Sequence, residues 1–163
     1  MEIFDIYDGN GDKTGQTAER GTKLKADEYA MVADVWIRNK SGLYLISRRT
    51  PNKVFFPCVW EPTCGTAISG ENSFDTALRE VKEELGLTLY GNNGKKLKRI
   101  FLEEYGWMVD IWIFNQDFDI NSVILQPGET DSAKWASKEE IIDLQKNGSF
   151  IVKSRIPYLH EFL

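Results

Sequence analysis

The sequence predicts an α+β fold in which β-strands surround one amphipathic helix. Two β-rich runs, Tyr29–Ile37 and Leu43–Ser47, are joined by a polar turn, as in a β-hairpin. Their nearly continuous hydrophobicity indicates strands that are covered on both faces. A second strand pair is expected at Leu97–Tyr105 and Met108–Phe114, after a flexible turn over residues 91–96. The helix is expected between the two pairs.

The N-terminal part of the chain predicts a short strand at Ile3–Tyr7, followed by the polar segment DGNGDKTGQ. Its aspartates and glycines faintly resemble a calcium-binding loop. Such a loop ends in a bidentate glutamate, which is missing here. We therefore interpret residues 8–16 as a polar hairpin turn.

The central helix has a clear start, a clear stop and one apolar face. Asn72 is suited to the N-cap, and Gly86 supplies the residue that ends a helix. Apolar residues recur at helical spacing, namely Phe74, Ala77, Leu78, Val81 and Leu85. At about 100° per residue, Glu80, Glu83 and Glu84 lie beside that face rather than opposite it.

These three glutamates allow two interpretations. Carboxylates crowded beside a buried face repel one another, and partial burial adds a desolvation cost. A hard divalent cation with oxygen ligands would reverse the sign of that cost. Alternatively, the three residues form an ordinary solvated acidic face.

The C-terminal third is expected to be less regular. Residues 117–126 read as an irregular segment that ends in a short strand at Ser122–Leu125. Ser137 is a suitable N-cap for a helix reaching residue 145 or 146, with Glu140 at the capping-box position. Residues 150–163 are expected to add a strand and a short helix. For Glu103, Glu104 and Asp110 we expect surface-facing strand positions.

Composition limits the class of protein. The 163 residues suit one domain, 1–163, and the 42% hydrophobic and 28% charged residues are typical of a soluble globular protein. A net charge of −5 argues against nucleic acid as the main partner. No apolar run is long enough to cross a membrane. Two cysteines without a signal peptide indicate a reduced, cytoplasmic setting.

A basic loop precedes the helix. Arg49 and Lys53 follow the second strand, in a segment that leads towards the acidic helix. An arginine fork and a lysine point charge are suited to binding a phosphate group. The alternative is an ordinary solvated basic loop.

The pattern around the helix resembles the Nudix box, with each of its positions filled. Gly65 is followed after five residues by Glu71 and after seven more by Arg79-Glu80-Val81-x-Glu83-Glu84-x-Gly86-Leu87. The resemblance implies an α/β/α sandwich with a mixed central sheet. It also implies hydrolysis of a diphosphate linkage in a nucleoside diphosphate derivative or another small organic diphosphate.

By the same resemblance, Glu80, Glu83 and Glu84 are expected to bind metal, with the carbonyl of Gly65 in the metal shell and Arg79 orienting the carboxylates. Many Nudix hydrolases carry a glutamate six residues before a tryptophan, and Glu129 has that offset from Trp135. Glu129 then resembles a further metal ligand or the catalytic base. The expected cofactor is Mg²⁺ or Mn²⁺, held by carboxylates and substrate phosphate. Glu83, Glu84 or Glu129 would accept the proton of the attacking water.

Two other functions are weighed against hydrolysis. The segment WEPTCG and the loop with Arg49 and Lys53 also resemble isopentenyl-diphosphate isomerase, whose catalytic thiol corresponds to Cys64. That family binds metal through histidines, whereas the only histidine here is His160. We therefore favour hydrolysis, and expect Cys64 to be a small buried residue. A binding module without catalysis is the third hypothesis, and modules of that kind usually lose box carboxylates.

The substrate stays open between nucleotides, prenyl diphosphates and other small diphosphates. Four aromatic residues are candidates for stacking on a base or for the core, namely Phe55, Phe56, Trp107 and Trp112. The number of metal ions stays open too. Dimers are frequent in the family, so a homodimer is an expectation.

Overall fold

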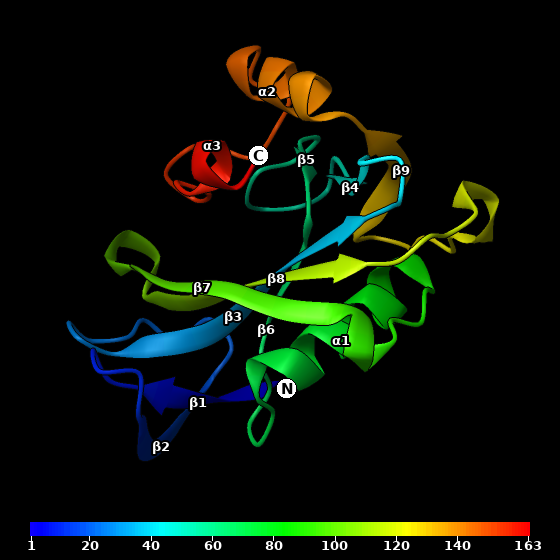
Figure 1. Cartoon of the computed structure of the whole chain (residues 1–163). Coiled ribbons are helices and arrows are strands. Elements are labelled where there is room, and N and C mark those ends of the chain that lie inside the picture. Colours follow the sequence, from blue (N-terminus) through cyan, green and yellow to red (C-terminus); the bar gives the residue numbers. More distant parts are fainter.

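The computed structural model describes all residues 1–163. In chain order the elements are β1 (Ile3–Tyr7), β2 (Lys13–Glu19), β3 (Tyr29–Arg38), β4 (Tyr44–Arg49), β5 (Trp60–Glu61), β6 (Thr63–Thr66), α1 (Ser73–Leu85), β7 (Gly94–Leu102), β8 (Trp107–Asn115), β9 (Thr130–Ala136), α2 (Lys138–Lys146) and α3 (Leu159–Phe162). Short 3₁₀ turns cover Gly91–Asn93, Glu103–Tyr105 and Ile120–Ser122. Figure 1 shows α1 on one side of the sheet and α2 and α3 on the other. The predicted sandwich with a mixed sheet is confirmed.

Strand β3 lies at the centre of the sheet. It runs parallel to β8 from the pair Ala30–Trp107 to the pair Arg38–Asn115, and antiparallel to β6. Nine of its ten residues are buried, as their continuous hydrophobicity predicts. The expected hairpin forms only at its turn, because β3 and β4 share the single pair Arg38–Tyr44. Beyond that pair β4 leaves β3 and pairs with β9.

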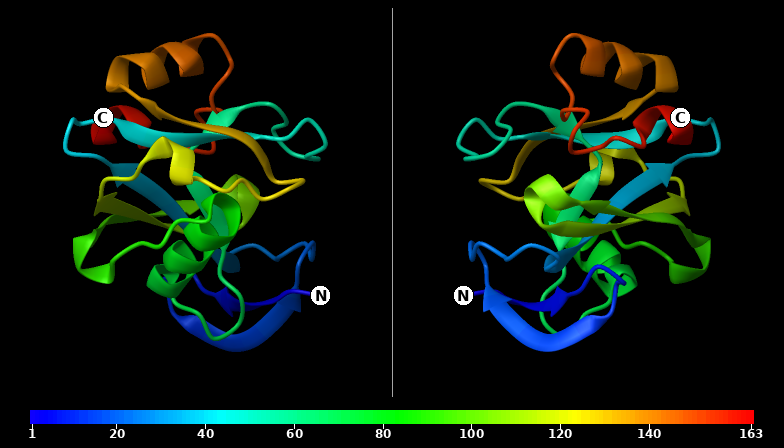
Figure 2. Two further views of the ribbon diagram at one scale, coloured as in Figure 1. Left: turned by 90° about the vertical axis from the view of Figure 1, so that its right-hand side faces the viewer. Right: turned by 90° about the vertical axis from the view of Figure 1, so that its left-hand side faces the viewer.

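The two faces of β3 are buried against different layers. Odd-numbered residues such as Val35 pack in one hydrophobic cluster with Val81 and Leu85 of α1. Even-numbered residues face the C-terminal layer, where the Trp36 ring lies 4.8 Å from the ring of Phe162. The turned views in Figure 2 show the same separation of α1 from the C-terminal helices. One strand therefore anchors both layers.

Several local expectations were wrong. Strand β2 begins at Lys13, inside the expected hairpin turn of residues 8–16, because it pairs with β1 there. Glu103 and Glu104 are exposed, as expected, but they lie in a 3₁₀ turn and not in a strand. Residues Ser122–Leu125 do not form a strand, because a 3₁₀ turn ends at Ser122 and the following residues are irregular. Strand β7 begins at Gly94, inside the expected flexible turn, because β8 provides it with a partner there. Asp110 does not face solvent. It is fully buried, accepts hydrogen bonds from Arg99 at 2.6 Å and from Ser73 at 2.6 Å, and so ties α1 to β7 and β8.

The C-terminal segment is fixed to the sheet by a buried polar network. The Arg155 guanidinium donates to both carboxylate oxygens of Asp34, at 2.6 and 3.1 Å. The Tyr158 hydroxyl donates to the same carboxylate and accepts from the indole of Trp36. The expected short helix is α3, whereas the expected strand is reduced to one bridge between Phe150 and Trp60. None of the helices is long and apolar enough to cross a membrane.

Candidate active site

Helix α1 is built as its sequence predicts. The Asn72 side chain accepts a hydrogen bond from the backbone N–H of Asp75 at 2.9 Å, which satisfies one of the free donors at the helix start. Gly86 ends the helix with φ of 68°, a left-handed conformation that costs glycine little. Val81 and Leu85 are buried. The helix therefore has one fixed rotation about its axis, and its glutamates are presented at one edge of the sheet.

Gly65 makes room for the side chain of Glu80 against β6. A Cβ atom at this position would lie 2.0 Å from Cδ of Glu80, so any other residue would displace the Glu80 carboxyl from its place. The missing side chain lets the Glu80 carboxyl lie directly against the backbone of β6. The first and the fourth specified positions of the sequence pattern, Gly65 and Glu80, thus become one contact.

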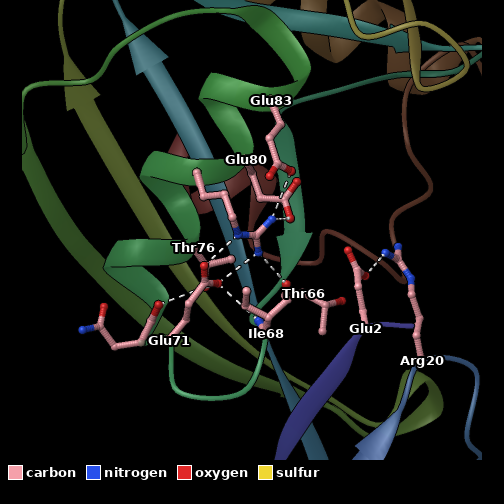
Figure 3. A network of polar contacts seen from close by, with 10 residues as sticks. Glu2, Arg20, Thr66, Ile68, Glu71, Thr76, Glu80 and Glu83 are labelled. Atoms are coloured by element: carbon pink, nitrogen blue, oxygen red, sulfur yellow. Dashed lines mark hydrogen bonds and ion pairs between the residues drawn. The ribbon is translucent and has the colours of Figure 1, made fainter.

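Arg79 links the acidic residues into a network (Figure 3). It donates to both carboxylate oxygens of Glu71, at 2.7 and 3.0 Å. It also donates to Glu80 at 2.7 Å, to Glu83 at 3.2 Å and to the carbonyl of Thr66 at 3.0 Å. Burial works against a charged Glu71, but the hydrogen bonds from Arg79, the Ile68 backbone and Thr76, together with the charge of Arg79, outweigh it and lower the pKa of that carboxyl. Arg79 therefore holds the acidic residues in place, as the resemblance implies.

Glu84 points into a more enclosed region than Glu83. Burial raises the pKa of the Glu84 carboxyl well above its usual value, and the nearby carboxylates of Glu61, Glu80 and Glu129 raise it further. Burial also raises the pKa of Glu80, although Arg79 opposes this effect. Glu83 is exposed at the outer side of the helix. Glu80 and Glu84 of α1 thus form one acidic cluster with Glu129, which is far from them in sequence.

Glu129 is held near α1 by the backbone around it. The carbonyl of Glu84 accepts hydrogen bonds from the backbone N–H of Gln126 at 3.0 Å and from the Thr130 hydroxyl at 3.3 Å. These bonds bring the start of β9 to the C-terminal end of the helix. The Glu129 carboxylate forms an ion pair with Lys53. The basic loop and the acidic cluster therefore meet directly.

Sequence reasoning missed Glu61 as a member of the site. It is 5% exposed, and its carboxylate accepts a hydrogen bond from Arg49 at 2.8 Å. Burial raises the pKa of this carboxyl, against the opposing charge of Arg49. The available signal was a glutamate between Trp60 and Pro62 in a β-rich run, where an acidic residue needs a partner to be buried. Arg49 is that partner, and its guanidinium also donates to the carbonyl of Phe55 at 3.1 Å.

Cys64 lies beside Glu61, with its sulfur 3.8 Å from a carboxylate oxygen. Burial raises the pKa of the thiol well above its ordinary value, and the Glu61 carboxylate raises it further. A thiol needs a lowered pKa to act as a strong nucleophile. The surroundings of Cys64 thus favour a neutral thiol, although the residue is half-buried and not fully buried as expected.

The donor set is of the kind that suits a hard divalent cation. Glu80, Glu84 and Glu129 supply carboxylate oxygens, the Gly65 backbone lies against Glu80, and no sulfur or imidazole ligand is needed. Burial raises the pKa of Glu84, and repulsion from the neighbouring carboxylates raises it further. A bound cation would offset this repulsion. Glu80 and Glu83 both hydrogen-bond to Arg79, so the carboxylates are turned towards the arginine and do not converge on one point.

Comparison with known proteins shows the family. The model of the NUDIX domain matches residues 28–157. An uncharacterized Nudix hydrolase of Listeria monocytogenes is 36% identical over 152 residues, which cover 93% of this chain and 89% of the relative. Among solved structures, DR0079 from Deinococcus radiodurans superposes with a TM-score of 0.77 at 19% identity and covers 98% of each chain. The chain therefore belongs to the Nudix hydrolase family, and the protein is a Nudix hydrolase.

A similarity to isopentenyl-diphosphate isomerase is also found, but it is more limited. The isomerase of Shigella flexneri is 33% identical over 86 residues, which cover 52% of this chain and 47% of the relative. The match thus spans about half of each protein. It agrees with the partial resemblance seen in the sequence.

Proposed function

We propose that this protein hydrolyses a diphosphate linkage in a small organic diphosphate, with Mg²⁺ or Mn²⁺ as the cofactor. The carrying observation is the half-buried acidic cluster of Glu80, Glu84 and Glu129, in which Glu80 lies against Gly65 and Glu129 pairs with Lys53 of the basic loop. A divalent cation supplies charge neutralisation of the phosphates and activation of the attacking water. The intact set of box carboxylates supports catalysis over a module that only binds.

Each group has a role in this proposal. Glu80, Glu83 and Glu84, with Glu129 and the carbonyl of Gly65, would hold the cation, for which Glu80 and Glu83 would have to turn from Arg79. One of the carboxylates of Glu83, Glu84 and Glu129 accepts the proton of the attacking water. Arg79 keeps the helix glutamates positioned through the hydrogen bonds described above.

Arg49 and Lys53 steady the phosphate group that does not react. Both are already engaged with carboxylates, Arg49 with Glu61 and Lys53 with Glu129. A phosphate group that enters at the exposed, charged end of the site would compete with these carboxylates for the two basic side chains. Lys53 is the freer of the two, because Arg49 also holds the loop backbone at Phe55. We therefore assign phosphate binding chiefly to Lys53 and loop positioning to Arg49.

The test is phosphate or nucleotide release with Mg²⁺ over a panel of nucleoside and non-nucleoside diphosphates. Glu83→Gln and Glu84→Gln are each expected to lower turnover by at least about 100-fold while the fold is kept. Glu139→Gln on the exposed side of α2 is the matched control and is expected to keep full activity. Calorimetry with Mg²⁺ gives an independent readout. Full activity of both helix variants, or no cation binding, would contradict the proposal.

Hydrolysis is favoured over isomerisation by the state of Cys64, whose thiol pKa is raised by burial. The identity of the products separates the two reactions. Cys64→Ala is expected to leave the hydrolytic rate within about threefold of the wild-type rate, because the sulfur makes no contact that hydrolysis needs. Loss of turnover in a stably folded Cys64→Ala variant would favour the isomerase hypothesis.

A further inference from the structure

The turn that carries Glu129 is held by two neighbouring segments of the fold. On the helix side, the carbonyl of Glu84 accepts a hydrogen bond from the backbone N–H of Gln126 at 3.0 Å. On the side of the basic loop, Thr50 contacts the turn twice. Its hydroxyl donates to the carbonyl of Gly128 at 2.9 Å, and its backbone N–H donates to the carbonyl of Glu129 at 3.1 Å. Thr50 therefore holds the carbonyls of two consecutive residues.

Regular strand pairing does not fix this turn. The pairing of β4 with β9 is regular up to Arg48, and its register shifts between Arg48 and Arg49, the last paired residue of β4. A shift of this kind is typical of a β-bulge, which bends a strand, redirects its side chains and is frequent beside active sites. Beyond the shift, the two hydrogen bonds from Thr50 take the place of the strand ladder.

The turn has little other restraint at Gly128. This residue has a left-handed φ of 82°, and a Cβ atom placed on it would have no neighbour within 4 Å. Glycine has more backbone freedom than any other residue. Without a donor at its carbonyl, the peptide of Gly128 can turn, and the side chain of Glu129 then moves with it.

Thr50 is well suited to hold a neighbouring segment. It is 8% exposed, and the following residue, Pro51, restricts its backbone to extended conformations. The side chains of Lys53 and Glu129, which form an ion pair in the same contact, are 21% and 40% exposed. The threonine is thus the buried part of the contact between the loop and the turn, and the charged pair is its more exposed part.

The Thr50 hydroxyl is placed for positioning and not for chemistry. A threonine that acts as a nucleophile needs an adjacent base. The proton of this hydroxyl is given to the backbone carbonyl of Gly128, and no carboxylate or imidazole accepts it.

We propose that Thr50 is a positioning residue that fixes the turn of residues 126–130, so that the Glu129 carboxylate is presented to the acidic cluster of α1. The inference rests on the proposed function, because Glu129 is one of the groups that would hold the cation there. Thr50 itself touches neither the cation nor the substrate. Its loss is therefore expected to act through Glu129 alone.

The test measures the affinity for Mn²⁺ by calorimetry on the full chain and does not depend on turnover. Thr50→Val keeps the shape of the side chain but lacks the hydroxyl, and it is expected to weaken cation binding about tenfold, because a ligand has lost its support. Thr50→Ser keeps the hydroxyl and is expected to bind the cation as the wild type does. Should Thr50→Val not fold, Thr50→Ala takes its place.

Thr14→Val is the matched control. The Thr14 hydroxyl also donates to a backbone carbonyl, that of Ile6 at 3.0 Å, but this bond lies within the N-terminal hairpin. The control variant is expected to keep the cation affinity of the wild type. Urea unfolding of each variant accompanies the titrations, because a bond that serves stability alone would lower stability and leave the cation affinity of the folded protein unchanged.

A double-variant cycle tests whether the effect passes through Glu129. In the background of Glu129→Gln, Thr50→Val is expected to change the cation affinity by less than about twofold, because the carboxylate that Thr50 positions is already absent. An equal loss of affinity in both backgrounds would overturn the inference, since Thr50 would then act by another route.

The outcomes separate this inference from the proposed function. Unchanged cation affinity of Thr50→Val would overturn the inference, and so would a failure of Thr50→Ser to keep that affinity. If the cycle gives the expected result but the wild type hydrolyses none of the diphosphates in the panel, the positioning role of Thr50 is supported and the proposed hydrolysis is contradicted.

Discussion

Replacement of Arg79 by alanine removes the centre of the acidic network. Arg79 makes five hydrogen bonds, two to Glu71 and one each to Glu80, Glu83 and the carbonyl of Thr66. Its side chain is 20% exposed, and those of Glu71 and Glu80 are 17% and 13% exposed. The variant would leave two largely buried carboxylates without their cation. We therefore expect a large loss of stability together with a loss of activity.

The magnitude follows from the burial of each partner. Removing one member of a buried ion pair costs about 3–5 kcal/mol, because a charge is left without compensation. The partial exposure of Glu71 and Glu80 places this site at the lower end of that range. The pair with Glu83, whose side chain is 48% exposed, adds less than about 1 kcal/mol. The expected decrease in the free energy of unfolding is thus about 3 kcal/mol.

Urea unfolding followed by circular dichroism measures this decrease. Arg79→Lys is expected to lose about half as much, because a lysine keeps the charge but not the planar fork. Arg48→Ala is the control. Arg48 is 42% exposed and donates to Asp131 at 2.8 Å, so its removal is expected to change the free energy of unfolding only slightly. A cost for Arg79→Ala no larger than that of the control would refute the assigned role of the network.

Three further predictions concern other charged or reactive groups. Arg155→Met is expected to destabilise the protein by about 3–5 kcal/mol in urea unfolding, since Asp34 is left buried without its partner. If the double variant with Asp34→Asn restores most of this loss, the unpaired charge is the cause. Hydrogen bonds from the Gly70 backbone and Lys13 lower the pKa of Asp5 to about 2. The ionised Asp5 therefore stabilises the fold above about pH 4 by about 1 kcal/mol after solvent screening, and this contribution is lost as the pH falls towards about 2. Asp5→Asn should therefore lose less stability in acid than the wild type. Identical profiles of stability against pH for the two proteins would exclude the effect. Iodoacetamide at pH 8 is expected to label the exposed Cys58 and to spare Cys64, whose thiol pKa is raised by burial. Peptide mass spectrometry measures the labelling, and equal modification of the two cysteines would contradict the prediction.

The sequence determined the parts of this protein that depend on neighbours along the chain. The limits of α1 follow from Asn72 and Gly86, and its buried face follows from apolar residues at helical spacing. The box pattern identified the family, because each of its residues is fixed relative to the others by a single turn and helix. Strand β3 was recognisable because both of its faces are apolar. Each of these features is encoded within about 25 residues of sequence.

Only the tertiary structure decided which distant groups meet. Glu61 belongs to the site because β5 pairs with β4, whose Arg49 donates to the Glu61 carboxylate, and Asp110 is buried because α1 covers β8 at Ser73. No local sequence pattern predicts either position, because an acidic residue in a strand has the same neighbours along the chain whether its side chain faces water or an arginine. Burial of a polar group is settled by the partner that arrives from elsewhere in the fold, and that partner cannot be read from the residues beside it.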